Sequence, residues 1–203
     1  MRTPSRKLAV LVVATGFAAL PAWAVATPDR TVHRVPADHH GHHGNYGNYG
    51  NDGHHRSAVL PAAVFLPKSA AGNRFEIVTG QLAQQRAQSD AIKALGAMFV
   101  TDHTAALQQV TQVAATLGVP LPAGLDPMQQ AIVDRLQTLS GAEFDAAWLQ
   151  AQIPAHRMAL RLHLRAAIRG ENDAVRTLGQ NALPVITKHL GELLDIAGSA
   201  GDR

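Results

Sequence analysis

The stretch 90–117, DAIKALGAMFVTDHTAALQQVTQVAATL, decides the fold of this chain. Its apolar residues recur every three or four positions, which places them on one side of an α-helix. Ser89 before the stretch is a preferred helix cap, and Gly118 after it is a typical stop. One histidine interrupts the apolar seam, which consists of Ile92, Gly96, Phe99, His103, Ala106, Val110, Val113 and Leu117. Such a seam needs other helices to cover it, so the stretch predicts a helical bundle.

The same spacing predicts three further long helices, at about 64–87, 141–169 and 173–197, and a short one at about 127–139. Asp126 followed by Pro127 is typical of a helix start, and Ser140 with Glu143 fits a capping box. No segment alternates between apolar and polar residues over the length of a strand. The chain is therefore predicted to be all-α, with four main antiparallel helices and one short extra helix.

Two more of these helices carry an isolated histidine among apolar residues. His156 shares a stripe with Leu149, Ile153, Leu160 and Leu164. His189 shares a seam with Val175, Leu178, Ala182, Val185, Glu192 and Ile196. A polar group on an inner seam must find a partner or bear a desolvation cost, so the interior is expected to hold a metal, a hydrogen-bond network or a pH-sensitive cluster. His163, between Arg161 and Arg165, is expected to face solvent.

The first 24 residues have the layout of a secretory signal peptide. A basic start (Arg2, Arg6, Lys7) precedes an apolar stretch at 8–20, and cleavage is expected after residue 24 or 26. An uncleaved membrane anchor is the alternative interpretation. The mature protein is expected in the periplasm or outside the cell, with association with the outer membrane as a further expectation.

Charge and cysteine usage exclude several classes of function. The chain has 18 basic and 15 acidic residues, and removal of the predicted signal peptide takes away three basic ones and leaves no excess. We therefore expect no nucleic-acid binding, which needs a clustered basic face. The chain has no cysteine, which excludes disulfides and thiolate metal sites.

Residues 25–58 are rich in glycine, asparagine and histidine and poor in large apolar residues. Such a segment buries too little surface to offset its ordering entropy, so we expect a disordered tether ahead of a bundle at 60–199. Its histidines suit copper, nickel or zinc, although a plain solubilising linker is the alternative. They are His33 and the candidate ligands His39, His40, His42, His43, His54 and His55.

An ordered set of short motifs gives the chain a family resemblance over about residues 60–197. It begins with Val64-Phe65-Leu66, the stretch 70–77 (AAGNRFEI) and the stretch 80–83 (GQLA). It continues with Ser89, Lys93, Met98, Val100, Asp102-His103, the stretch 141–145, His156, Leu183-Pro184 and His189-Leu190. The set resembles domain of unknown function 4142, a family of mostly exported bacterial proteins. The resemblance implies a ferritin-like four-helix bundle, and the family has no established biochemical role.

The residues argue against the dinuclear carboxylate site that a ferritin-like fold invites. Such a site needs Glu-x-x-His in two helices, but Val100 and Ile186 stand three residues before His103 and His189. A mononuclear site for zinc, copper or iron is chemically sound, with one ligand from each helix. Its candidate ligands are Glu76, His103, His156 and His189. The alternative is that these histidines form hydrogen bonds with one another, with Glu76, Asp102 or Glu192, or with buried water.

Three functions stay open at this point. The leading interpretation is a non-enzymatic envelope protein that binds a metal or a partner through the bundle. The second is a metal-dependent oxidase or peroxidase that uses the Glu/His site. The third is a module for an anionic membrane surface, because basic residues recur every four positions at Arg157, Arg161, Arg165 and Arg169.

Overall fold

The computed structural model describes residues 58–201, so the predicted signal peptide and most of the predicted tether lie outside the described residues. This part of the chain is helical. It contains α1 (Ala62–Arg86), α2 (Asp90–Leu117), the short α3 (Pro127–Thr138), α4 (Gly141–Arg169) and α5 (Asp173–Gly201). The predicted all-α fold, with four main helices and one short extra helix, is confirmed. The last helix is longer than predicted, because it continues through Gly198 and Ser199.

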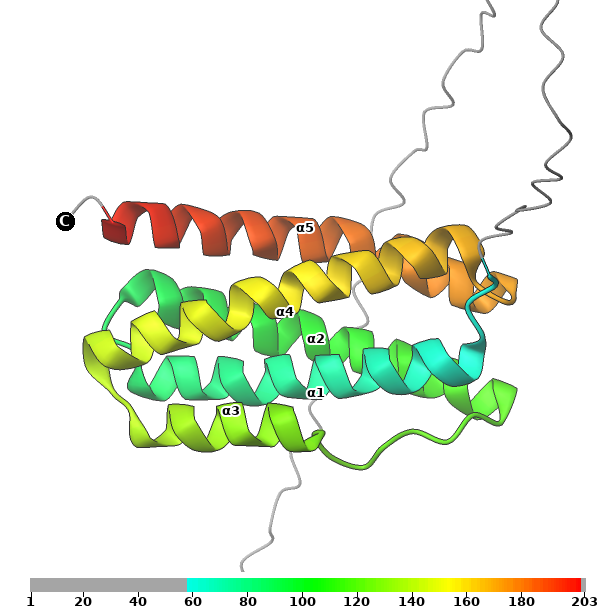
Figure 1. Cartoon of the computed structure of the whole chain (residues 1–203), viewed down its shortest axis with the longest axis horizontal. Coiled ribbons are helices and arrows are strands. Elements are labelled where there is room, and N and C mark those ends of the chain that lie inside the picture. The colour runs from blue at the N-terminus through cyan, green and yellow to red at the C-terminus, as the bar shows by residue number, and fades with distance from the viewer. Residues whose placement is uncertain (1–57, 202–203) are drawn as a thin grey trace, which may run out of the picture. The chain divides into compact units, whose positions relative to one another are not determined.

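The bundle consists of two antiparallel hairpins, α1 with α2 and α4 with α5 (Figure 1). The hairpins pack so that α1 lies beside α4 and α2 lies beside α5, and both of these neighbouring pairs are also antiparallel. The chain returns from the end of α2 to the start of α4 through the loop at 118–126 and through α3. Helix α3 packs outside the four main helices against α1 and α4. No helix among residues 58–201 is long and apolar enough to cross a membrane.

The helix ends follow the local sequence at most positions. The Ser89 hydroxyl accepts a hydrogen bond from the Ile92 backbone N–H, and Gly118 ends α2 with a left-handed φ of 65°. The capping box predicted at Ser140 is wrong, because its side chain makes no capping hydrogen bond. Gly141 follows it with a φ of 62°, which turns the backbone away from capping-box geometry. A capping box is formed instead at Asp126, together with the side chain of Gln129.

Two glycines set the close approach of α1 and α2. A Cβ atom added to Gly80 would lie 2.6 Å from the carbonyl oxygen of Gly96, and one added to Gly96 would lie 2.7 Å from the Cβ of Ala83. The absence of side chains at both positions lets the helices cross at this point. Because Phe99 comes one turn after Gly96, the crossing also brings that ring into the centre of the bundle.

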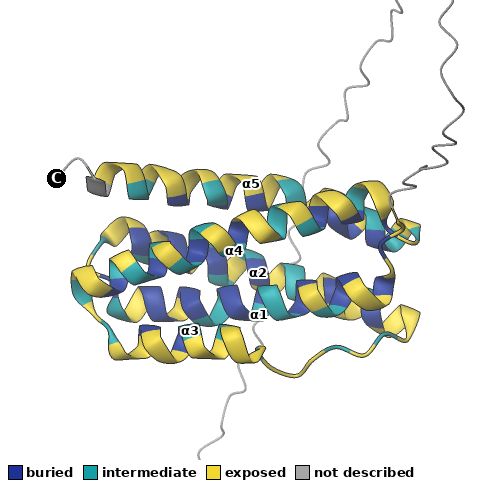
Figure 2. Cartoon of the chain, in the orientation of Figure 1, coloured by how far each residue is buried: buried dark blue, intermediate teal, exposed yellow. Residues whose placement is uncertain are grey.

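The interior has two apolar clusters with a polar layer between them. Buried residues of the four main helices form a dark stripe along the inside of the bundle (Figure 2). One cluster contains Phe75, Phe99 and Trp148, and the other contains Phe65, Val110 and Val175. Between them along the helices lie buried polar residues, which are Ser69, Asn73, Glu76, His103, His156, His163 and His189. This layer contains the candidate site, which His103, His156 and His189 form.

Candidate metal centre

The three histidines predicted from the helix seams meet inside the bundle. His103 comes from α2, His156 from α4 and His189 from α5, and one ring nitrogen of each lies within 4.8 Å of the others. Their ring centroids are 5.2 to 5.8 Å apart. The rings are 7%, 1% and 0% exposed, so water does not compete for them at the surface. The two hairpins therefore share one imidazole cluster, to which α1/α2 contributes one ring and α4/α5 contributes two.

The protonation of His156 follows from its neighbour one turn earlier. Its Nδ1 lies 3.1 Å from the backbone carbonyl oxygen of Gln152, which accepts hydrogen bonds and donates none. Nδ1 of the neutral ring therefore carries the proton, and Nε2 carries the lone pair. That Nε2 is buried and has no hydrogen-bond partner.

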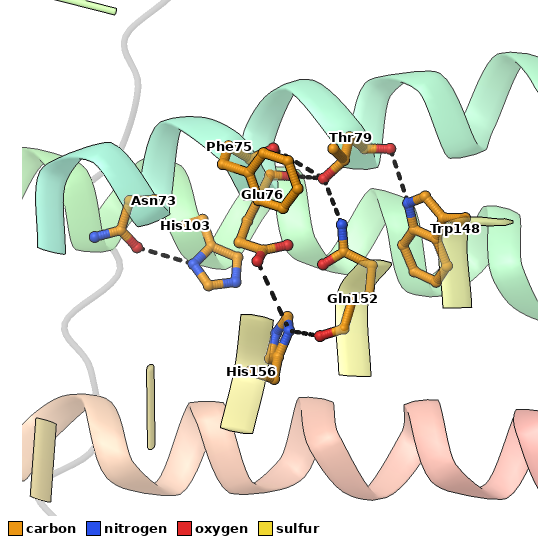
Figure 3. Close-up of polar contacts among 8 residues, drawn as sticks. All are labelled: Asn73, Phe75, Glu76, Thr79, His103, Trp148, Gln152 and His156. Carbon is orange, nitrogen blue, oxygen red and sulfur yellow. Dashed lines mark hydrogen bonds and ion pairs between the residues drawn. The ribbon is translucent and has the colours of Figure 1, made fainter. Parts of the chain in front are cut away.

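His103 is oriented in the same way by an amide side chain of α1. The Asn73 Nδ2 donates to the carbonyl oxygen of Ser69 at 2.9 Å, which directs the Asn73 Oδ1 toward His103. That oxygen lies 2.8 Å from His103 Nδ1, which must therefore donate (Figure 3). His103 Nε2 then carries the lone pair, and it too is buried without a partner.

His189 completes the set through a carboxylate on α2. Its Nε2 lies 3.0 Å from the Asp102 Oδ2 and donates to it, which leaves the lone pair on Nδ1. This nitrogen is the third buried ring nitrogen without a partner. In each histidine one nitrogen is thus held by a hydrogen bond while the other carries a free lone pair. Protein metal sites orient their histidine ligands by the same kind of outer hydrogen bond.

Phe99 forms an aromatic wall against the cluster. Its ring stacks on His156 with centroids 4.7 Å apart, lies at the same distance from His189, and meets His103 edge-on at 5.6 Å. Trp148 packs on Phe99 at 5.4 Å and donates its indole N–H to the carbonyl oxygen of Thr79 (Figure 3). This packing fixes the positions of the three imidazole rings and excludes water from one side of them.

Glu76 lies beside the cluster without joining it. Its Oε1 is 3.8 Å from His156 Nδ1 (Figure 3), and its Oε2 is buried without a partner. Burial raises the pKa of the Glu76 carboxyl well above its usual value, and the neighbouring Gln152 amide opposes this only in part. The donor atoms within 4.8 Å of one another include those of the three histidines and not those of Glu76. Of the four predicted ligands, the structure brings three together.

Burial holds the three histidines in the neutral form. It lowers the pKa of His103 well below the usual value, and the neighbouring His156 and His189 add to this effect. Burial, followed by His189, lowers the pKa of His156 to about 4. Burial also lowers the pKa of His189, against the opposing effect of Asp102. At neutral pH all three free nitrogens are lone-pair donors, which is the form that a metal ion binds.

The metal-free protein is expected to lose stability as the pH falls from about 6.5 toward 4, because the histidines take up protons in the unfolded chain before they do so in the folded one. His156 alone, with a folded pKa of about 4, accounts for a loss of about 3 kcal/mol. The raised pKa of Glu76 acts in the opposite direction, but it is one group against four, because burial lowers the pKa of His163 as well. Urea denaturation at a series of pH values checks this, and unchanged stability between pH 7 and 4.5 would contradict it.

The expectation that His163 faces solvent is wrong. His163 is buried, its Nδ1 donates to the carbonyl oxygen of Ala159 at 2.9 Å, and its Nε2 accepts from the Ser69 hydroxyl at 3.2 Å. The neighbouring arginines suggested exposure, but they lie on the other side of α4. Leu164 was expected on the stripe of His156, but it lies on the same side of α4 as these arginines and is 48% exposed.

Sequence reasoning missed Asn73, Gln152 and Phe99 as parts of the site. The available signal was the spacing: Asn73 stands three residues before Glu76, and Gln152 stands four residues before His156. A second polar residue on a buried seam, one turn from a candidate ligand, indicates a residue that orients it. The tether histidines at positions 39, 40, 42, 43, 54 and 55 lie outside the described residues.

The family described as a domain of unknown function, DUF4142, has a model that matches residues 54–196. This chain belongs to that family. The match covers α1 to α4 and all but the end of α5, so it includes every residue of the candidate centre, and it confirms the resemblance found in the sequence. No curated protein matches this DUF4142 chain.

Solved structures share the fold at low sequence identity. A DUF305 protein from Streptomyces coelicolor matches with a TM-score of 0.60 and 14% identity, over 70% of this chain and 94% of that one. CopM in its Cu(II)-bound form matches with a TM-score of 0.59 and 17% identity, over 70% and 98% of the two chains. CopM in its Ag-bound form matches with a TM-score of 0.58 and 18% identity, over 69% and 97%. At these identities the likeness shows a common helical-bundle fold.

Proposed function

We propose that this DUF4142 protein is an exported protein that binds one copper-class metal ion inside its bundle, through His103 Nε2, His156 Nε2 and His189 Nδ1. Two observations carry this proposal: one ring nitrogen of each histidine lies within 4.8 Å of the others, and each histidine has one buried ring nitrogen without a partner. A buried polar atom without a partner costs about 1–3 kcal/mol. Three such atoms in one cluster destabilise the metal-free protein, and a bound metal ion would give each of them a partner.

The donor set favours copper or zinc over harder ions. Imidazole nitrogens suit zinc, copper, iron and nickel, whereas magnesium, calcium and manganese prefer oxygen ligands. Among divalent ions a given nitrogen site binds copper most tightly. CopM, which shares the fold, has been crystallised with Cu(II) and with silver, so the architecture accommodates ions of this class in another protein. Two carboxylates lie beside the cluster, but Glu76 is not grouped with the three histidine donors and Asp102 is hydrogen-bonded to the outer nitrogen of His189, so the site lacks the carboxylate ligands of a dinuclear iron site.

Burial favours storage or transport of the ion over catalysis. The three histidines are at most 7% exposed, and Phe99 covers one side of them, which leaves little room for a substrate beside the ion. An oxidase or peroxidase needs an open coordination position. Export is supported by the signal-peptide pattern of residues 1–24. It is also supported by the DUF305 protein of similar fold, which is described as a secreted protein.

The bundle site and the tether are expected to release metal at different pH values. Histidines of ordinary pKa, near 6.5, lose metal to protons as the pH falls below neutrality, whereas the lowered pKa values of the bundle histidines shift this competition to a lower pH. We therefore expect the predicted mature chain, residues 25–203, loaded with Cu(II), to release its metal in two steps. The bundle step is expected to hold one ion per chain.

A variant with the six candidate tether histidines changed to alanine isolates the bundle step. It is expected to keep one copper ion per chain at pH 6 after dialysis. A variant that is folded and metal-free at pH 7 would overturn the proposed function. Peroxide-dependent oxidation of a dye by the loaded variant, with repeated turnover, would favour the enzyme interpretation instead.

A further inference from the structure

The outer face of the second half of α4 combines arginines with exposed apolar side chains. We call it the arginine face and define it by Arg157, Met158, Arg161, Leu164, Arg165, Ile168 and Arg169. Met158, Leu164 and Ile168 are 62%, 48% and 61% exposed. In Figure 2 this half of α4 carries exposed residues interspersed with buried and intermediate ones. Large apolar side chains scattered singly are normal, but three among four arginines on one helical face form a patch.

The positive charge of the arginine face is not neutralised within the described part of the chain. None of its four arginines forms an ion pair among residues 58–201. Helix α4 has no acidic residue after Asp145, and Glu171, which follows the helix, accepts the Ala62 backbone N–H. Arg165 makes only a long hydrogen bond of 3.4 Å to a backbone carbonyl oxygen. The guanidinium groups are therefore available to an anionic partner.

The face is also hollowed. A surface depression of about 570 Å³ is lined by Ala58, Arg161, Leu164, Arg165, Ile168 and Arg169. Basic residues near the end of a helix interact favourably with its dipole, which explains Arg165 and Arg169. The dipole does not explain Arg157, three turns from the end, or the exposed apolar residues.

We propose that the arginine face docks on the surface of an anionic phospholipid bilayer, with α4 lying along the membrane plane. Planar guanidinium groups bind phosphate with two parallel hydrogen bonds, and exposed Leu, Ile and Met side chains bury into the acyl boundary. Both groups lie on one face of α4, as they do in helices that lie in the membrane interface. A nucleic acid or a soluble polyanion would bind the arginines but leave the apolar side chains exposed, whereas a bilayer interface accommodates both groups.

The arginine face and the imidazole cluster use opposite sides of α4. His156 and His163 point into the bundle, whereas Arg157 and Leu164, the residues that follow them, are exposed. A bilayer can therefore cover the outer side of α4 without displacing the residues of the metal centre. The docking surface does not depend on the proposed metal function, so the two can be tested separately.

Vesicle co-sedimentation of residues 25–203 tests this docking surface. The protein is expected to bind vesicles of phosphatidylcholine with 30–40% phosphatidylglycerol and not vesicles of phosphatidylcholine alone, with weaker binding at high salt, since each basic residue at such a surface contributes about 1 kcal/mol. The double substitution R161E/R165E is expected to lower the partition coefficient at least about tenfold. The double substitution L164S/I168S is expected to lower it in high salt, where the apolar contribution dominates.

A matched control places the same change of charge elsewhere on the surface. Lys68 and Arg135 are exposed on α1 and α3, and K68E/R135E is expected to bind vesicles nearly as well as the wild type. Circular dichroism of every variant checks that the bundle is intact. Failure of the wild type to bind anionic vesicles, an equal loss in the control, or binding to soluble polyglutamate as tight as to vesicles would each overturn the docking surface.

Discussion

Replacing His156 with leucine is expected to lower the affinity of the bundle for copper or zinc at least about 100-fold. Structural sites bind zinc with a free energy of about 10–16 kcal/mol, to which all of the ligands contribute. The loss of one of three nitrogen ligands therefore lowers the binding free energy by several kcal/mol. The metal-free variant is expected to be at least as stable as the wild type. Leucine of similar volume removes the unpartnered Nε2, which outweighs the lost hydrogen bond from His156 Nδ1 to the Gln152 carbonyl oxygen.

His163→Leu is the matched control, because it makes the same chemical change seven residues further along α4, at a buried histidine outside the three-histidine cluster. It is expected to leave metal affinity unchanged and to lower the free energy of unfolding by about 1–3 kcal/mol, since the Ser69 hydroxyl loses its partner. Chelator-competition titration gives the affinities, and urea denaturation without metal gives the stabilities. If His156→Leu kept wild-type affinity, or if both variants lost affinity equally, the histidine cluster would not be the binding site.

Trp148→Ala is expected to lower the free energy of unfolding by about 4 kcal/mol, the largest effect on stability that we predict. Trp148 is fully buried, packs on Phe99 and donates its indole N–H to the Thr79 carbonyl oxygen. Its removal leaves a cavity behind the aromatic wall, so metal affinity is expected to fall as well. Thermal or urea denaturation of the metal-free protein measures the change.

Trp148→Phe separates the packing contribution from the hydrogen bond. It retains an aromatic ring against Phe99 and is expected to recover at least half of the lost stability. A loss below about 1 kcal/mol in Trp148→Ala would mean that Trp148 does not fill the interior at this end of the bundle.

The helices could be predicted because each carries its own periodic seam and end signals. The seams also placed His103 and His189 inside the bundle, where the structure has them, although Val185 and Glu192 of the second seam are exposed. The stripe chosen for His156 was partly wrong, because Leu164 is exposed while His163 is buried. Helix α4 carries leucine and isoleucine on its outer face as well, so apolar spacing alone did not fix its rotation.

The burial of His163 depends on a tertiary contact that no local pattern shows. A Cβ atom added to Gly179 would lie 2.7 Å from the His163 carbonyl oxygen, so this glycine of α5 lets the two helices approach there. The partners of the site histidines depend on tertiary contacts in the same way. Asn73 and Asp102 reach rings on helices other than their own, and only the packed bundle shows which nitrogen each one holds.

The position of the bound ion tests the metal centre most directly. A crystal structure of residues 25–203 grown with copper, with anomalous data collected at the copper edge, locates the ion without assumptions about its ligands. We predict an anomalous peak inside the bundle, about 2.0–2.2 Å from His103 Nε2, His156 Nε2 and His189 Nδ1. Well-ordered crystals with copper bound elsewhere, and with all three ring nitrogens free of metal, would contradict the proposed centre.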